Sequence, residues 1–102
     1  MSTKIDLTKN FDNAEAILKE KGIECIRRDD VLIPGVMERH CIQAKETDEK
    51  GYPTWDFICQ TGSYGGEDGL LEYWSKKMRD SGQDPDGWLT AEEVLAKIEA
   101  GD

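Results

Sequence analysis

The chain has 102 residues, enough for one hydrophobic core and too few for two. It carries 13 basic and 22 acidic residues, a net charge of −9, which argues against direct binding to nucleic acid or to an anionic membrane, whose phosphates it would repel. Apolar and aromatic residues are spread along the chain, so we expect a folded domain over residues 1–102, with room for a flexible N-terminus at residues 1–10.

The cysteines bear on the cellular compartment. Cys25, Cys41 and Cys59 are an odd number and contain no CxxC pair, whereas secreted disulfide frameworks usually show an even set. The first ten residues have no apolar run, so we expect no signal peptide, and no stretch is apolar for long enough to cross a bilayer. These features together predict a cytoplasmic protein.

The first predicted element is a helix over residues 13–21. Asp12 is placed to cap it, Glu15 stands at the capping-box position, and Gly22 provides the stop. Its apolar face is formed by residues at helical spacing, namely Ala14, Ile17 and Leu18.

The middle third of the chain predicts a three-stranded antiparallel meander. The strands are expected at residues 23–28, 36–45 and 54–61. Asp29 and Asp30 should break the first strand, and the short apolar piece at 31–33 should lead into a Pro-Gly turn at 34–35. On the last strand, Trp55, Phe57 and Cys59 should share one face.

The C-terminal third predicts one or two helices. Leu70, Trp74 and Met78 repeat at helical spacing, although the same run is short and aromatic enough to form a strand. Residues 83–89 are expected to form a loop before a helix over 91–100, capped by Thr90 with Glu93 at the capping-box position. The predicted fold is therefore an α+β domain of two layers, in which an N-terminal helix and the C-terminal helices pack on one face of the meander.

The charge is concentrated near the C-terminus. Residues 84–102 contain six acids and one base, more than half of the net charge. Since no complete catalytic set is visible, we predict a non-enzymatic adaptor or inhibitor whose acidic C-terminal surface engages a basic protein, such as a nucleic-acid-binding protein whose ligand it mimics. The expected partner-binding residues are Asp84, Asp86, Trp88, Glu92 and Glu99. For Trp88 the first interpretation is that it fastens the loop to the core, and the alternative is an exposed anchor.

Residues 82–93 offer a second hypothesis, because they resemble an EF-hand calcium loop. Gly87 falls at the tight-turn position, and Gly82 stands at the first position, where the family has Asp. The oxygen ligands would come from Asp84, Asp86, Thr90 and Glu93. A run of turn-forming residues followed by a helix cap explains the same sequence without Ca²⁺, and we favour that explanation.

A third hypothesis is a small enzyme built on His40. Its neighbour Cys41 should face the other side of the sheet, but Cys25 or Cys59 on an adjacent strand could approach the imidazole, where Zn²⁺ could also join them. Such an enzyme would require His40, a cysteine and the glycine-rich loop at 62–69 to converge in a concave pocket. The simpler interpretation makes the cysteines core residues and the glycines turn residues.

Overall fold

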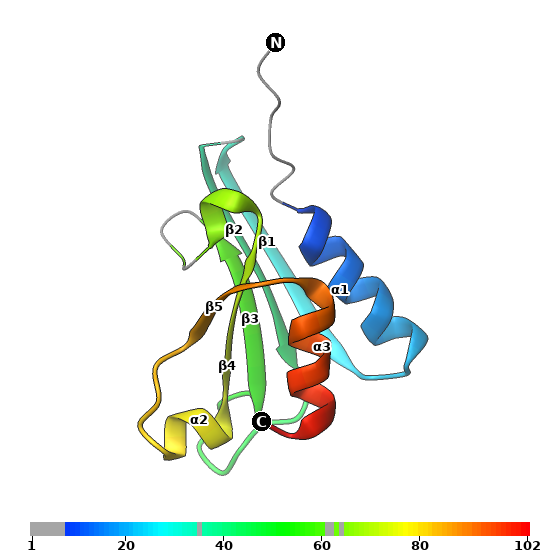
Figure 1. Ribbon diagram of the computed structural model, residues 1–102, viewed down its shortest axis with the longest axis vertical. Coiled ribbons are helices and arrows are strands. Elements are labelled where there is room, and N and C mark those ends of the chain that lie inside the picture. The colour runs from blue at the N-terminus through cyan, green and yellow to red at the C-terminus, as the bar shows by residue number, and fades with distance from the viewer. Residues whose placement is uncertain (1–7, 35, 61–62, 64) are drawn as a thin grey trace.

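The computed structural model describes residues 8–34, 36–60, 63 and 65–102. Figure 1 shows its arrangement of helices and strands. In chain order the elements are α1 (Lys9–Glu20), β1 (Cys25–Ile33), β2 (Met37–Ala44), β3 (Trp55–Gln60), the 3₁₀ turn η1 (Gly66–Asp68), β4 (Leu71–Ser75), α2 (Lys76–Asp80), β5 (Asp86–Leu89) and α3 (Ala91–Ala100).

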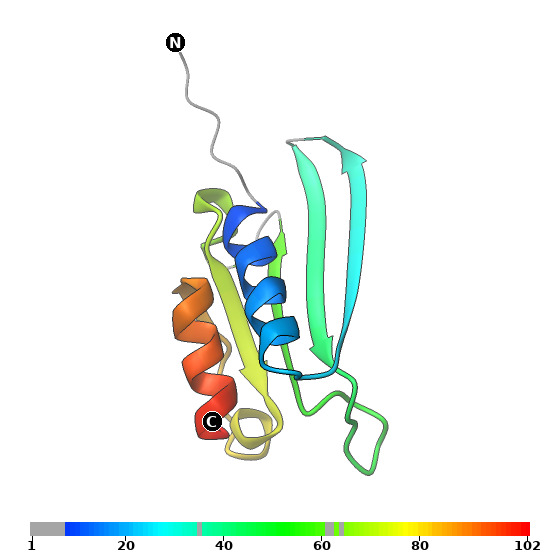
Figure 2. The ribbon, with the colours of Figure 1, turned by 90° about the vertical axis from the view of Figure 1, so that its right-hand side faces the viewer.

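The strands form one antiparallel sheet in the order β1-β2-β3-β4-β5. Helices α1 and α3 lie on the same side of this sheet, as Figure 2 shows. The predicted α+β class, with an N-terminal helix and C-terminal helices, is therefore confirmed. The prediction of three strands is wrong, since the described part of the chain forms five.

Two stretches account for the extra strands. Residues 70–78 are neither all helix nor all strand: β4 ends at Ser75, whose side chain accepts a hydrogen bond from the Met78 amide and so starts α2. The predicted loop at 83–89 contains β5, which pairs with β4. A short edge strand of four residues with Gly in it carries too little periodicity to be recognised from sequence.

The first strand is longer than predicted. β1 runs through Asp29 and Asp30 to Ile33, because Asp29 has partners in the folded sheet: Arg27 donates to it at 2.9 Å. Asp is depleted in strands, but tertiary context can override that preference.

The two larger helices differ in how well their ends were predicted. Helix α1 begins at Lys9, about one turn earlier than expected, and Asp12 binds Arg27 instead of capping the helix. Helix α3 has the predicted bounds, with the reciprocal capping box of Thr90 and Glu93, and ends at Gly101 with a φ of 75°.

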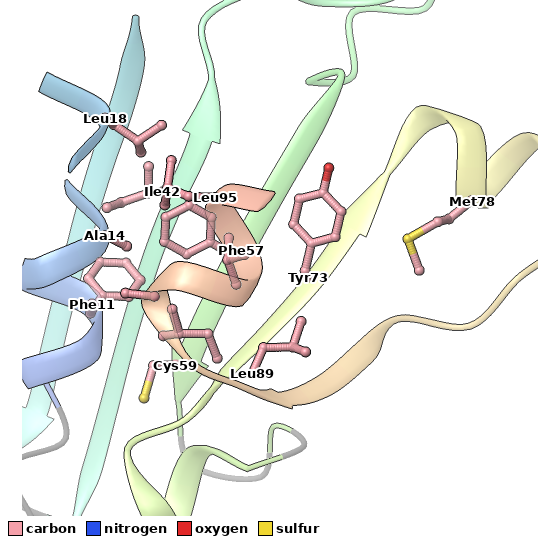
Figure 3. Close-up of a cluster of buried hydrophobic side chains, with 13 residues drawn as sticks. Phe11, Ala14, Leu18, Ile42, Phe57, Cys59, Tyr73, Met78, Leu89 and Leu95 are labelled. Atoms are coloured by element: carbon pink, nitrogen blue, oxygen red, sulfur yellow. The ribbon is translucent and has the colours of Figure 1, made fainter. Parts of the chain in front are cut away.

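The core lies between the helices and the sheet (Figure 3). Phe11 from α1 meets Phe57 from β3 edge to face, with ring centroids 5.6 Å apart. The other core residues labelled in Figure 3 are Ala14, Leu18, Ile42, Cys59, Tyr73, Met78, Leu89 and Leu95. This core uses one face of the sheet; the side chains of Arg28, Cys41, Asp56, Glu72 and Trp74, which alternate with the core positions, belong to the opposite face, called the open face below.

Candidate functional site

A β-bulge on β5 creates the most unusual local conformation of the described chain. Leu71 pairs with Leu89 and Tyr73 with Asp86, so that Gly87 and Trp88 together oppose a single residue of β4. Trp88 takes a φ of +54°, and no other non-glycine residue in the described ranges has a positive φ. Bulky side chains rarely adopt this region, and bulges often serve to redirect a side chain.

Gly65 fits against the backbone of this bulge. A Cβ atom on Gly65 would lie 2.8 Å from the Trp88 Cα and 2.9 Å from its amide nitrogen, and Gly65 itself has a φ of +88°. A glycine is therefore required here twice over, by conformation and by space. The turn role predicted for the glycine-rich loop is confirmed at this position.

The bulge leaves the Trp88 side chain 58% exposed. The interpretation that Trp88 fastens the loop to the core is therefore wrong; Leu89, the next residue, is the one buried there. The exposure required by the alternative is present, and a role as an anchor for a partner stays a prediction.

Most acids of the C-terminal segment have partners within the chain. Of the six acids in residues 84–102, four are engaged, through the pairs Asp86–Lys97 (2.9 Å), Glu99–Lys21, Asp102–Lys77 (3.3 Å) and Glu93–Thr90 (3.1 Å). The charge of −5 already counts Lys97, so the balancing bases from outside the segment are Lys21, which follows α1, and Lys77 of α2. Sequence position alone does not reveal these two pairs.

The remaining two acids, Asp84 and Glu92, are exposed and form no ion pair among the described residues. They lie before and after β5, on either side of Trp88 in the chain. Glu99 is separated from Glu92 by about 10 Å along the axis of α3 and lies against α1. Four of the five predicted partner-binding residues, Asp84, Asp86, Trp88 and Glu92, lie in β5 or close to it in the chain, and they are called the Trp88 surface below.

The segment that resembles a calcium loop contains ordinary structural contacts. The Glu93 carboxylate accepts from the Thr90 amide at 3.1 Å, and Asp86 pairs with Lys97. Within the described ranges, no group of three or more His, Cys, Asp or Glu side chains is arranged to hold a metal ion. These contacts support the turn-and-cap interpretation, and calcium binding stays a prediction for titration to test.

His40 is buried between two carboxylates on the helix-covered face of the sheet. Its side chain is 4% exposed, with Nδ1 2.6 Å from Asp29 Oδ1 and Nε2 2.9 Å from Glu38 Oε1. Burial opposes the ionisation of Asp29, but hydrogen bonds from Arg27 and His40 outweigh it and lower the pKa of that carboxyl. Both imidazole nitrogens are occupied, so neither is available to activate a thiol.

Cys59 lies directly across the β2–β3 ladder from His40, and its thiol donates to the Gly66 carbonyl at 3.8 Å. Burial, with a smaller contribution from Glu38, raises the pKa of Cys59 to about 11, so the thiol is protonated at neutral pH. His40 and Cys59 do converge with Gly66 of the glycine-rich loop, and both side chains are buried. This arrangement favours the structural interpretation.

A cavity of about 630 Å³ lies elsewhere, near the C-terminal end of α3. Trp55, Tyr73 and Ile98 line it, together with Lys77 and Asp102, which pair with each other. None of the residues predicted as a site lines this cavity.

Comparisons with protein-family models, with curated proteins and with solved structures found no match for this chain. In the portion that the structure describes, no helix combines the length and the apolar character needed to cross a membrane.

Proposed function

We propose that this chain is a non-enzymatic interaction module that binds a basic protein through the Trp88 surface. The observation that carries the proposal is Trp88 itself: its indole is exposed, and its backbone is held in a left-handed bulge against Gly65. An aromatic side chain on a fixed backbone loses little conformational entropy on binding, and tryptophan is enriched among the residues that dominate binding energy.

The acids around Trp88 supply the second part of the proposal. Asp84 and Glu92 are exposed and have no ion pair in the described chain, so a basic partner can approach them without displacing an internal base. Charges of this kind increase the association rate and select the sign of the partner. A nucleic-acid-binding protein is a partner of suitable chemistry, because its functional surface is rich in Lys and Arg.

The test compares partner capture by immobilised wild-type protein and by two variants. We expect W88A to weaken binding of the captured partner about thirtyfold, as for a central interface tryptophan. We expect D84N/E92Q to weaken it at low salt, with a difference that shrinks as salt is added. The matched control is E20Q/E49Q, which removes two exposed acids from α1 and from the β2–β3 connection.

Thermal melts of all variants would show whether they fold equally well. The same partners captured in equal amounts by wild type, W88A and D84N/E92Q would refute the proposal. Equal losses in D84N/E92Q and E20Q/E49Q would show that net charge, and not the Trp88 surface, is recognised.

A further inference from the structure

Among the described residues, β1 forms the other edge of the sheet and has a strand neighbour on one side only. It is nine residues long, and an edge strand of this kind presents peptide groups that no strand of the described chain pairs with. The Lys45 amide donates to the Glu24 carbonyl, which shows that the peptide groups of Glu24 point toward β2. Peptide groups of an antiparallel strand alternate in direction, so those of Ile26 and Arg28 also point toward β2. The peptide groups of Arg27, Asp29 and Val31 consequently point to the free edge.

The hairpin of β1 and β2 also exposes a cluster of apolar side chains at its tip. The exposed fractions range from 43% to 63% for Val31, Leu32, Ile33, Val36 and Met37. Figure 2 shows this hairpin extending past the end of α1, so the helix does not cover the tip. A concentration of exposed apolar residues at one end of a sheet commonly marks an interaction site.

The charges on β1 identify the partner strand. On the open face, Arg28 and Asp30 lie two residues apart with Asp29 between them. If a second β1 strand runs antiparallel about a two-fold axis at Asp29, Arg28 of each copy lies opposite Asp30 of the other. We propose that two copies of this chain associate through β1 in this register, which joins their sheets into one.

Registers shifted from this one mismatch the charges of the open face. Moving the second strand by two residues in one direction places Arg28 opposite Arg28, and in the other direction Asp30 opposite Asp30, and like charges in direct opposition are destabilising. A shift by one residue would place the open face of one copy on the same side of the joined sheet as the helix-covered face of the other. The proposed register is therefore the one in which the open-face charges match.

The same register covers apolar surface. The regular part of β1 ends at Val31, before the bulge at Leu32, so the exposed side chain of Ile26 lies near the apolar hairpin tip of the other copy, while Arg28 and Asp30 occupy non-hydrogen-bonded positions, where side chains approach most closely. The two Asp29 residues meet at the axis, but each is already bound by Arg27 and His40 of its own copy. The segment from Arg27 to Asp30 has no net charge, so the repulsion between two chains of −9 is long-range and is screened by salt.

Sedimentation at physiological salt, over a wide range of concentrations, tests the proposal with four proteins. Wild type should shift from 11.5 kDa toward twice that mass as concentration rises. R28D places like charges opposite each other twice per dimer and should raise the dissociation constant at least about tenfold. R28D/D30R restores opposite charges between the copies and should return the constant to within about threefold of wild type, although it also reverses the charge opposite Arg39 on β2 of the same chain. K19D, the matched control, makes the same charge change on α1 and should leave the constant unchanged.

A backbone variant provides an independent arm. The Val31 amide points to the free edge, so V31P removes a hydrogen-bond donor from the proposed pairing and none from the β1–β2 ladder. The variant should therefore not associate, and its melting temperature should equal that of the wild type. A wild-type chain that stays monomeric at all concentrations would overturn the proposal. So would a dimer that R28D and V31P leave intact, because its interface would lie elsewhere.

Discussion

Asp56 offers the sharpest test of the electrostatics of the open face. It lies on β3, paired in register with Gln43 on one side and Trp74 on the other. Burial raises the pKa of Asp56 to about 6; Arg79 opposes this rise and Glu72 adds to it. The substitution D56N keeps the shape of the side chain and removes the ionisable group.

The expected change in the free energy of unfolding follows from the rise of the Asp56 pKa by about two units above the ordinary value of 3.8. At about 1.4 kcal/mol per unit this corresponds to about 3 kcal/mol, which we reduce to about 1–2 kcal/mol because the side chain is partly solvated. Since the folded state holds this proton more tightly than the unfolded state, the stability contributed by protonated Asp56 is full below pH 4 and is lost as pH rises through 6. D56N should therefore stabilise the protein at pH 7 and have little effect at pH 4.

Urea denaturation of wild type and D56N at the two pH values measures this difference. D48N is a control of opposite sign: the Asp48 carboxylate accepts hydrogen bonds from the Tyr52 and Lys50 amides, and its pKa is lowered, so its loss should destabilise the protein at pH 7. A D56N variant no more stable than wild type at pH 7 would refute the argument. An equal gain at both pH values would show that the effect is not due to ionisation.

Three further predictions concern local structure. T90A removes the cap of α3 and should lower the free energy of unfolding by about 1 kcal/mol, as measured by urea denaturation. G66A should be more destabilising than G82A, since a Cβ atom at Gly66 would lie 2.2 Å from the Gln60 carbonyl oxygen, whereas Gly82 has open space and only an unfavourable φ; equal melting temperatures would contradict this. Calorimetric titration with millimolar Ca²⁺ should give no binding heat at residues 82–93, and a saturable heat that is lost in E93Q would restore the calcium hypothesis.

Helix α3 shows what the sequence alone can predict. Its cap at Thr90, its capping-box partner Glu93 and its stop at Gly101 all lie within one turn of the helix ends, and the predicted bounds are confirmed. Strand β1 shows the limit. From the sequence alone, Asp29 is expected to break the strand. In the folded sheet it pairs with Arg27 and His40, and His40 belongs to the neighbouring strand.

The Trp88 surface was only partly predictable for the same reason. Its residues stand in the sequence, but the bulge forms because β4 and β5 pair with unequal numbers of residues, and Gly65 contacts it from another loop. The internal partners of the acids come from Lys21 and Lys77, far away in the chain. Local charge density therefore overstated the acidity available to a partner.

The two proposals concern opposite edges of one sheet, and this has a consequence for binding. The Trp88 surface belongs to β5 and the self-association surface to β1, at the two ends of the strand order. A dimer joined at β1 would carry its two Trp88 surfaces far apart and both accessible, so that a partner with repeated basic sites could bind both at once. Linked sites of this kind can increase apparent affinity about a hundredfold without any new contact.

R28D should then weaken binding to a surface densely coated with partner and leave binding to sparse, single partner molecules unchanged, whereas W88A should weaken both. If R28D weakened both measurements equally, β1 would be contributing directly to partner binding, and the separation of the two surfaces would be wrong.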